Sequence, residues 1–146
     1  MLDKYYKITD KVSTYGKDLG LLFLRLVLAY GFYGPAMMKL KSFKNTVGFF
    51  EGIGIPLPEI NAVLATVTET LGFVLLFLGL GIRIITFPLM MTMLVAIFFV
   101  HWKNGYDVGN NGIEIPLYYL IMLFVLFTQG GGKYSFDYFL RKKLKK

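Results

Sequence analysis

Cysteine is absent from this chain of 146 residues, and histidine occurs only once, as His101. The missing cysteine excludes disulfide bridges, thiolate metal sites, thiol nucleophiles and iron–sulfur clusters. A single imidazole excludes a three-histidine zinc site and a haem ligated by two histidines. The chain also contains no glycine-rich phosphate loop, metalloprotease motif, serine elbow or dinucleotide-binding fingerprint. The sequence therefore predicts no metal site.

Charged residues are also scarce. They make up 17% of the chain, while 55% is hydrophobic and the mean hydropathy is +0.57. A soluble domain of this size would need more polar surface, and the apolar residues come in blocks of membrane length. The composition favours a single integral membrane domain over residues 1–146 and makes a soluble helical bundle the weaker alternative.

Four apolar segments are expected to cross the membrane as helices, at about 19–38, 60–82, 84–102 and 115–129. Asp18 or Thr14 could cap the first segment. The fourth has about 15 residues and rises only about 23 Å, less than a hydrocarbon core of about 30 Å. The predicted fold is thus all-α, a polytopic membrane protein with a four-transmembrane-helix bundle.

A short interfacial helix is predicted between the first two segments. Phe43, Val47 and Phe50 recur there at helical spacing, while Lys44 and Glu51 lie off that face. An amphipathic helix of this kind lies in the plane of the membrane interface.

The basic residues indicate the orientation of the bundle. The tails, 1–18 and 133–146, together with Arg83 in the turn between the second and third segments, hold 11 Lys and Arg, against 4 on the opposite side. Positive residues favour the cytoplasm, so both termini are expected there. The tails are short and close to the membrane, which favours contact with the lipid bilayer and argues against a nucleic-acid partner.

Two charges interrupt the apolar segments, Arg25 in the first and Glu69 in the second. A charged side chain at mid-bilayer costs about 3 kcal/mol on translocon scales, so such residues face a protein interior, pair, or mark a pathway. Their depths differ by a distance that an extended arginine could bridge. The pair is therefore read as a ligand-binding or proton-active carboxylate held by a cation, or as a structural salt bridge.

Further polar residues are expected at the outer mouth of the bundle. His101, Asn104 and Glu114 come from the segment between the third and fourth spans, and Lys39 closes the first span. Aromatic side chains, including Tyr33, Trp102 and Tyr119, fall towards the same interface as an aromatic belt. The alternatives are a solvated loop, an interfacial histidine, and a lysine that extends to the headgroups.

Several strings, in this order and spacing, carry a family resemblance: LLFLRLVLAYGF, MMKL, FFEGIGIPLPE, TVTETLGFVLLFLGLGIR, VAIFFVHWKNGY and NNGIEIPLYYLIMLF. With them the chain resembles the DoxX family of small bacterial membrane proteins over about residues 19–137. The resemblance implies a four-helix transmembrane bundle in the bacterial inner membrane, and a subunit of a quinone-linked or oxidative-stress-related redox system. One departure is Tyr33, which stands where members often have histidine.

The resemblance carries over six positions: Arg25, Lys39, Glu69, His101, Asn104 and Glu114. The leading hypothesis is a redox subunit that acts with a soluble or membrane partner and binds a quinone or similar lipophilic ligand in an outward-facing pocket. Glu69 and His101 are the candidate catalytic residues, Arg25 would orient Glu69, and Tyr33 and Trp102 would line the walls. The alternatives are a non-catalytic scaffold or assembly protein, and a small-solute or proton transporter, which would require a homo-oligomer.

Overall fold

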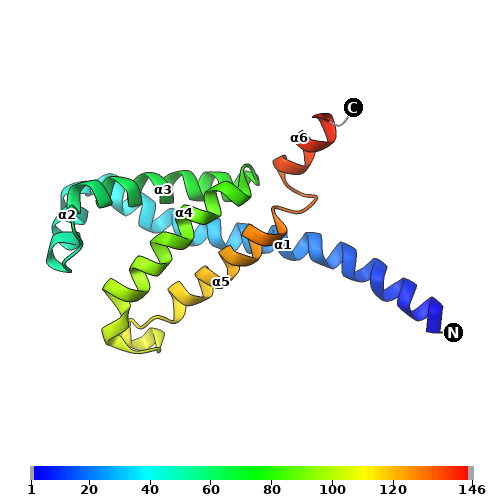
Figure 1. Ribbon diagram of the computed structural model, residues 1–146, viewed down its shortest axis with the longest axis horizontal. Coiled ribbons are helices and arrows are strands. Elements are labelled where there is room, and N and C mark those ends of the chain that lie inside the picture. Colours follow the sequence, from blue (N-terminus) through cyan, green and yellow to red (C-terminus); the bar gives the residue numbers. More distant parts are fainter. Residues whose placement is uncertain (1, 145–146) are drawn as a thin grey trace.

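The protein is helical along nearly its whole length (Figure 1). The computed structural model describes residues 2–144, and of these it describes no side chains at 2–8, 10, 11 and 14. No strand occurs within that range. The helices are α1 (Leu2–Lys41), α2 (Phe43–Gly52), α3 (Pro58–Leu78), α4 (Ile82–Val95), a π-helix (Ala96–His101), short 3₁₀ turns (Trp102–Asn104 and Val108–Asn110), α5 (Glu114–Gln129) and α6 (Phe136–Leu144).

The four long helices form one bundle, in which α1 packs along α3 and α4 packs along α5. We call the end that carries α2 and residues 102–113 the loop end. The opposite end, where α3 and α5 finish and α6 begins, is the tail end. The first part of α1 and most of α6 project beyond the bundle at the tail end (Figure 1).

The first helix is longer than predicted. It begins at Leu2 rather than near residue 19, so the expectation that Asp18 or Thr14 caps it is wrong. No proline interrupts residues 2–34, and proline is the residue that stops a helix most strongly. Asp18 therefore lies within the helix, and its carboxylate accepts a hydrogen bond from the Lys133 amide instead (3.1 Å).

Three helical stretches are long and apolar enough to cross a membrane: Tyr15–Lys41, Pro58–Leu78 and Ile82–Asn104. They confirm the membrane-bundle class and the positions of the first three predicted spans. The helix α5, with 16 residues, is shorter than each of these three stretches. A span formed by α5 stays a prediction.

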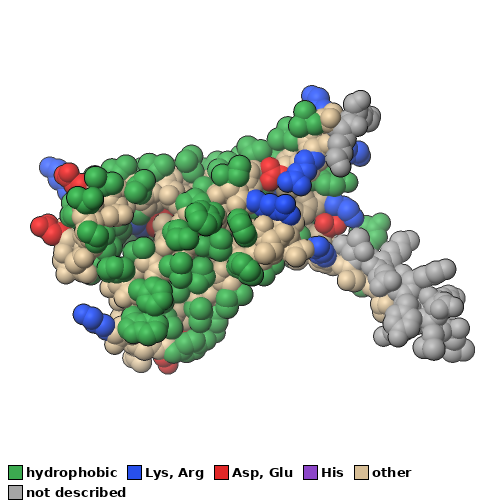
Figure 2. All heavy atoms as spheres, viewed as in Figure 1, with side chains coloured by type: hydrophobic (Ala, Val, Ile, Leu, Met, Phe, Trp, Pro, Cys, Tyr) green, Lys and Arg blue, Asp and Glu red, His purple; other side chains and the backbone are tan. Residues whose placement is uncertain are grey.

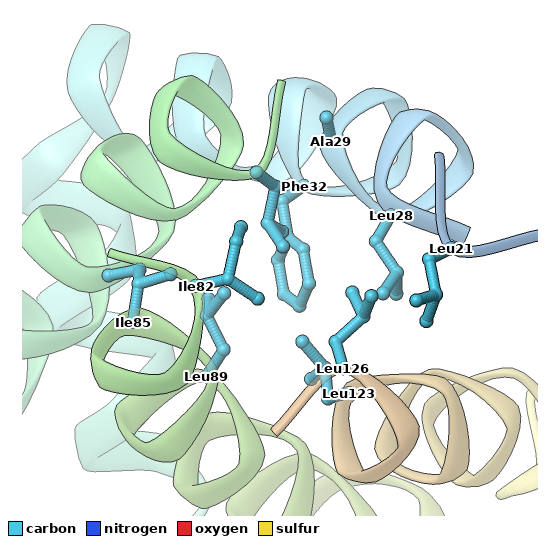
Figure 3. Close-up of a cluster of buried hydrophobic side chains, with 10 residues drawn as sticks. Leu21, Leu28, Ala29, Phe32, Ile82, Ile85, Leu89, Leu123 and Leu126 are labelled. Atoms are coloured by element: carbon cyan, nitrogen blue, oxygen red, sulfur yellow. The ribbon is translucent and has the colours of Figure 1, made fainter. Parts of the chain in front are cut away.

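The centre of the bundle is a cluster of buried apolar side chains from all four long helices (Figure 3). Leu28, Leu76, Leu89 and Leu123 are completely buried, one from each of the long helices. The outer surface is equally apolar, and large hydrophobic side chains cover much of it (Figure 2). Extensive exposed apolar surface is expected where lipid, rather than water, surrounds the protein.

The short helix α2 occurs where the sequence predicted a helix, and its apolar face is also as predicted. Phe50 is buried with Ile55 and Ala62, and Phe43 and Val47 pack against this cluster. The face therefore binds α2 to the bundle. Its position at the membrane interface stays a prediction.

Candidate functional site

Glu69 is held by a cation, and that cation is Lys39. The Lys39 Nζ lies 2.7 Å from the Glu69 Oε2, close enough for an ion pair and a hydrogen bond. Only 14% of the lysine side chain and 8% of the glutamate side chain are exposed. Near the end of α1, Lys39 thus turns inward to the middle of α3. It does not extend away from the protein, as an isolated lysine at a helix end usually does.

The predicted pairing of Arg25 with Glu69 is wrong. Arg25 is only 1% exposed and lies at the tail end, where its Nη2 donates to the Tyr134 carbonyl (2.8 Å). Its Nε and Nη1 have no hydrogen-bond partner within the described residues. The prediction failed because the partner segment, residues 134–137, lies more than 100 residues away and the sequence marks it only as a tail.

A cluster of polar contacts surrounds Arg25 at the tail end. The Asp137 carboxylate accepts hydrogen bonds from the amides of Gly81 (2.8 Å) and Ile82 (3.0 Å) at the start of α4. Asp18 pairs with the Lys133 ammonium (3.0 Å), and its hydrogen bond and charge raise the pKa of Lys133. These contacts dock the tail against α1 and α4. The sequence does not mark Asp137 as a cap, because it lies 56 and 55 residues from the two amides that it binds.

Replacing Asp137 with alanine should destabilise the protein by about 2 kcal/mol. The two amides at the start of α4 would lose their acceptor, and the buried Arg25 would lose the nearby negative charge that acts on it. Titration with a denaturing detergent, followed by the fluorescence of Trp102, measures the change. Glu51→Ala, which removes an exposed carboxylate in the last turn of α2, is the matched control and should be nearly neutral.

A cavity of about 220 Å³ brings together the two candidate catalytic residues. Glu69 of α3 and His101 at the end of the π-helix both line it. Its remaining walls are mostly apolar or aromatic, with Phe32, Met93 and Tyr119 among them. Mostly apolar walls with a few polar groups are typical of small-molecule sites. The predicted combination of Glu69 with His101 is thus present in the structure.

His101 is presented to the cavity by an irregular helix. Residues 96–101 form a π-helix, a rare element that is frequent at functional sites. The His101 Nδ1 lies 2.7 Å from the Asn111 carbonyl oxygen. A carbonyl can only accept, so Nδ1 carries the proton, and Nε2 of the neutral ring is left as an acceptor. The sequence predicted the position of His101 but not the π-helix.

Tyr119 enters the cavity because Gly31 leaves room for it. A Cβ atom at position 31 would overlap the Tyr119 hydroxyl group, so only glycine fits there with the ring in place. The ring also packs edge-on against Phe32, with centroids 5.7 Å apart. Tyr119 was predicted only as part of an interfacial aromatic belt, because spacing alone does not reveal which helix face meets a glycine.

The other predicted site residues lie outside the cavity. Glu114 accepts hydrogen bonds from the Val108 amide and the Tyr118 hydroxyl group, both at 3.0 Å, and so holds the loop 102–113 in place. Asn104 donates to the same Asn111 carbonyl as His101 (3.1 Å). Tyr33 and Trp102 do not line the cavity, and both residues are more than half exposed. Glu114, Tyr33 and Trp102 therefore do not line this cavity, and a role for them in ligand binding stays a prediction. Asn104 is linked to His101 through a shared acceptor.

Comparison with known proteins agrees with this architecture. The family model DoxX matches residues 20–102. An uncharacterised protein of Haemophilus influenzae is 32% identical over 140 residues, which is 90% of each chain. A putative oxidoreductase, CatD, of Bacillus subtilis is 31% identical over 106 residues, covering 73% of this chain and 74% of the relative. No solved structure matches significantly.

The matched region contains α2, α3 and α4, with the whole π-helix and the two residues of the Lys39–Glu69 pair. It therefore covers most of the bundle and the polar half of the cavity. This chain is a membrane protein and belongs to the DoxX family.

Proposed function

We propose that the protein is a membrane subunit of a quinone-linked or oxidative-stress-related redox system, and that it binds a quinone or similar lipophilic ligand in the 220 Å³ cavity. The observation that carries the proposal is that Glu69 and His101, from separate helices, line one cavity with aromatic and apolar walls. The printed name of the Bacillus subtilis relative, a putative oxidoreductase, is consistent with such a role.

The residues of the cavity fit a quinone headgroup. The volume suits one or two fused rings rather than a whole isoprenoid molecule, whose tail would extend into the surrounding lipid. The Glu69 Oε1 accepts no hydrogen bond within the described residues, because Oε2 alone contacts Lys39. Together with the His101 Nε2, it supplies two acceptors for the hydroxyl groups of the reduced ligand, the quinol. A quinone carbonyl only accepts, so it would bind His101 when Nε2 carries the proton.

Each residue has a distinct role in this proposal. A bound quinone supplies redox chemistry with two electrons and two protons, while the electrons come from a partner protein. His101 holds or transfers a proton at Nε2, and the Asn111 carbonyl fixes its ring orientation. Lys39 keeps Glu69 in place beside the cavity. Phe32 and Tyr119 exclude water from the ring of the ligand.

The membrane topology is part of the same proposal. With α5 as a fourth span, both termini lie on one side, and the excess of Lys and Arg at the tail end assigns that side to the cytoplasm. The protein would then lie in the bacterial inner membrane, with α2 on the outer leaflet. The cavity would be in the outer half of the bundle, accessible from lipid.

Ligand binding can be measured with the single tryptophan of the chain, because Trp102 directly follows His101. Titration of the detergent-solubilised protein with the reduced, quinol form of a short-chain benzoquinone or naphthoquinone, whose hydroxyl groups donate, should change its fluorescence. Glu69→Gln and His101→Ala should each weaken binding about tenfold, the usual effect of losing one polar contact to a ligand. Glu59→Gln, with the same chemical change on the exposed start of α3, should have no effect.

Unchanged affinity in the double variant Glu69→Gln/His101→Ala would contradict the site. Affinity that survives both substitutions would place the ligand on the lipid-facing surface instead. If the wild-type protein shows no saturable change in Trp102 fluorescence, a scaffold role becomes the better description, and the ion pair and the tail-end contacts would serve to order the bundle.

A further inference from the structure

A second and larger cavity lies at the tail end of the bundle. Its volume is about 420 Å³, and it is bordered by α1, by the start of α4, by the glycine run 130–132 and by α6. It is therefore separate from the cavity of Glu69 and His101, at the opposite end of the helices. In Figure 2, Lys and Arg side chains gather where α5 ends and α6 begins.

The walls of this cavity carry more positive than negative charge. Four cations line it, namely Lys17, Arg83, Lys133 and Arg141. Its two carboxylates are already engaged, since Asp18 pairs with Lys133 and Asp137 accepts from two amides of α4. The formal charge of the lining is thus +2, and the cations that remain unpaired attract an anion.

Hydrogen-bond donors remain available around the cavity. One nitrogen of Arg83, Nη2, donates to the Thr128 carbonyl (3.0 Å), which holds the guanidinium at the rim. Its other nitrogens bond to no acceptor within the described residues. The same is true of the amides of Gly131 and Gly132, which line the cavity in the irregular segment after α5. A fixed guanidinium with free nitrogens is well suited to a phosphate oxygen pair.

The location of the cavity favours a lipid headgroup over a free phosphate ion as the ligand. It lies at the level where the apolar stretches of α1 and α4 begin, which is the depth of phospholipid headgroups. Ile84 lines the cavity and is 80% exposed, and Phe87, one turn further along α4, is 53% exposed. An apolar surface suited to an acyl chain therefore continues directly from the cationic wall.

The helix α6 supports the same assignment. Phe136, Phe139 and Leu140 are exposed, and the basic residues Arg141, Lys142 and Lys143 follow in its last turn. Apolar and basic residues on one short helix are typical of helices that lie on an anionic membrane surface. A helix held at that surface places Tyr138 and Arg141, which line the cavity, beside the headgroups.

We propose that this tail-end cavity is a binding site for the phosphate headgroup of an anionic phospholipid, bound by Arg83, Lys133, Arg141 and Lys17, with an acyl chain along Ile84 and Phe87. The site does not depend on the quinone proposal, because it shares no lining residue with the other cavity. It would fix the tail end of the bundle to one leaflet.

The test is native mass spectrometry of the full chain released from vesicles that contain equal amounts of phosphatidylglycerol and phosphatidylcholine. The wild-type protein should retain phosphatidylglycerol preferentially. Arg83→Gln/Arg141→Gln should lower that preference at least tenfold, since each cation near an anionic surface contributes about a factor of five. Lys44→Gln/Lys103→Gln removes two exposed cations at the loop end and should leave it unchanged.

An equal loss of phosphatidylglycerol preference in both double variants would show that only the overall charge matters, and this would overturn the proposed site. Displacement of the retained lipid by millimolar glycerol 3-phosphate or inorganic phosphate would also overturn it, since the pocket would then recognise a soluble phosphate. Circular dichroism and the intrinsic fluorescence of Trp102, which reports on the other end of the bundle, check that the Arg83/Arg141 variant is folded.

Discussion

Replacing Lys39 with methionine should destabilise the protein by about 3 kcal/mol, the typical cost of removing one partner from a buried ion pair. Methionine retains the apolar stem that packs between α1 and α3 but removes the ammonium 2.7 Å from Glu69. The carboxylate would then be left with 8% exposure and no cation. Titration with a denaturing detergent, followed by Trp102 fluorescence, measures the free energy of unfolding.

The matched control is Lys41→Met, which removes an exposed lysine two residues further along the same helix. It should change the free energy of unfolding by less than about 0.5 kcal/mol. Adding Glu69→Gln to Lys39→Met should recover much of the stability, because no unpaired buried charge remains. Equal losses in Lys39→Met and Lys41→Met would show that the Glu69 carboxylate does not need its cation.

The second large effect is expected at Gly79, which ends α3 against the buried Arg25. Gly79→Ala should cost about 3 kcal/mol or more for two reasons. The residue has φ of +73°, a conformation that costs an L-residue about 1–2 kcal/mol. A Cβ atom would also overlap the Arg25 guanidinium and lie 2.8 Å from the Ser135 Cβ. Arg25 cannot retreat without losing its hydrogen bond to Tyr134.

Gly81 separates the two contributions. Its φ of +60° is also left-handed, but a Cβ atom there would meet nothing within 4 Å. Gly81→Ala should therefore show only the conformational cost, and the difference between the two variants isolates the displacement of Arg25, about 1–3 kcal/mol. If Gly79→Ala and Gly81→Ala are equally stable, Arg25 moves freely and is not fixed by the tail.

The sequence predicted the fold where the signal was local. Apolar blocks of membrane length revealed the first three spans, and helical spacing revealed the buried face of α2. The helix α5 ends at Gln129, where the fourth apolar segment was predicted to end. The length of α1 was missed because a charged and aromatic segment has no marker that tells a helix from a tail. A helical pattern without an apolar block indicates neither a membrane-spanning helix nor a helix that packs in a core.

The candidate site was predicted in part, and the errors have one cause. Glu69 and His101 were identified because each is the only residue of its kind in an apolar context. Their contacts were not identified: Lys39 was named as a site residue but not as the partner of Glu69, and Tyr119 was not named as a site residue, since both contacts depend on how the helices cross. Residue counts gave the depth of each side chain along its helix but not the rotation of the helix about its axis. That rotation decides which cation contacts Glu69.

The placement of Arg25 and Lys39 on α1 has a mechanical consequence. They are 14 residues apart, close to four full turns, so they lie within about 40° of each other around the helix axis. One bonds to the tail and the other to the middle of α3. A slip of α1 by one residue would turn both by about 100° and break both contacts at once. The two polar contacts thus fix the position of α1 along its axis and its rotation about that axis. Packing between similar apolar side chains alone would define both only loosely.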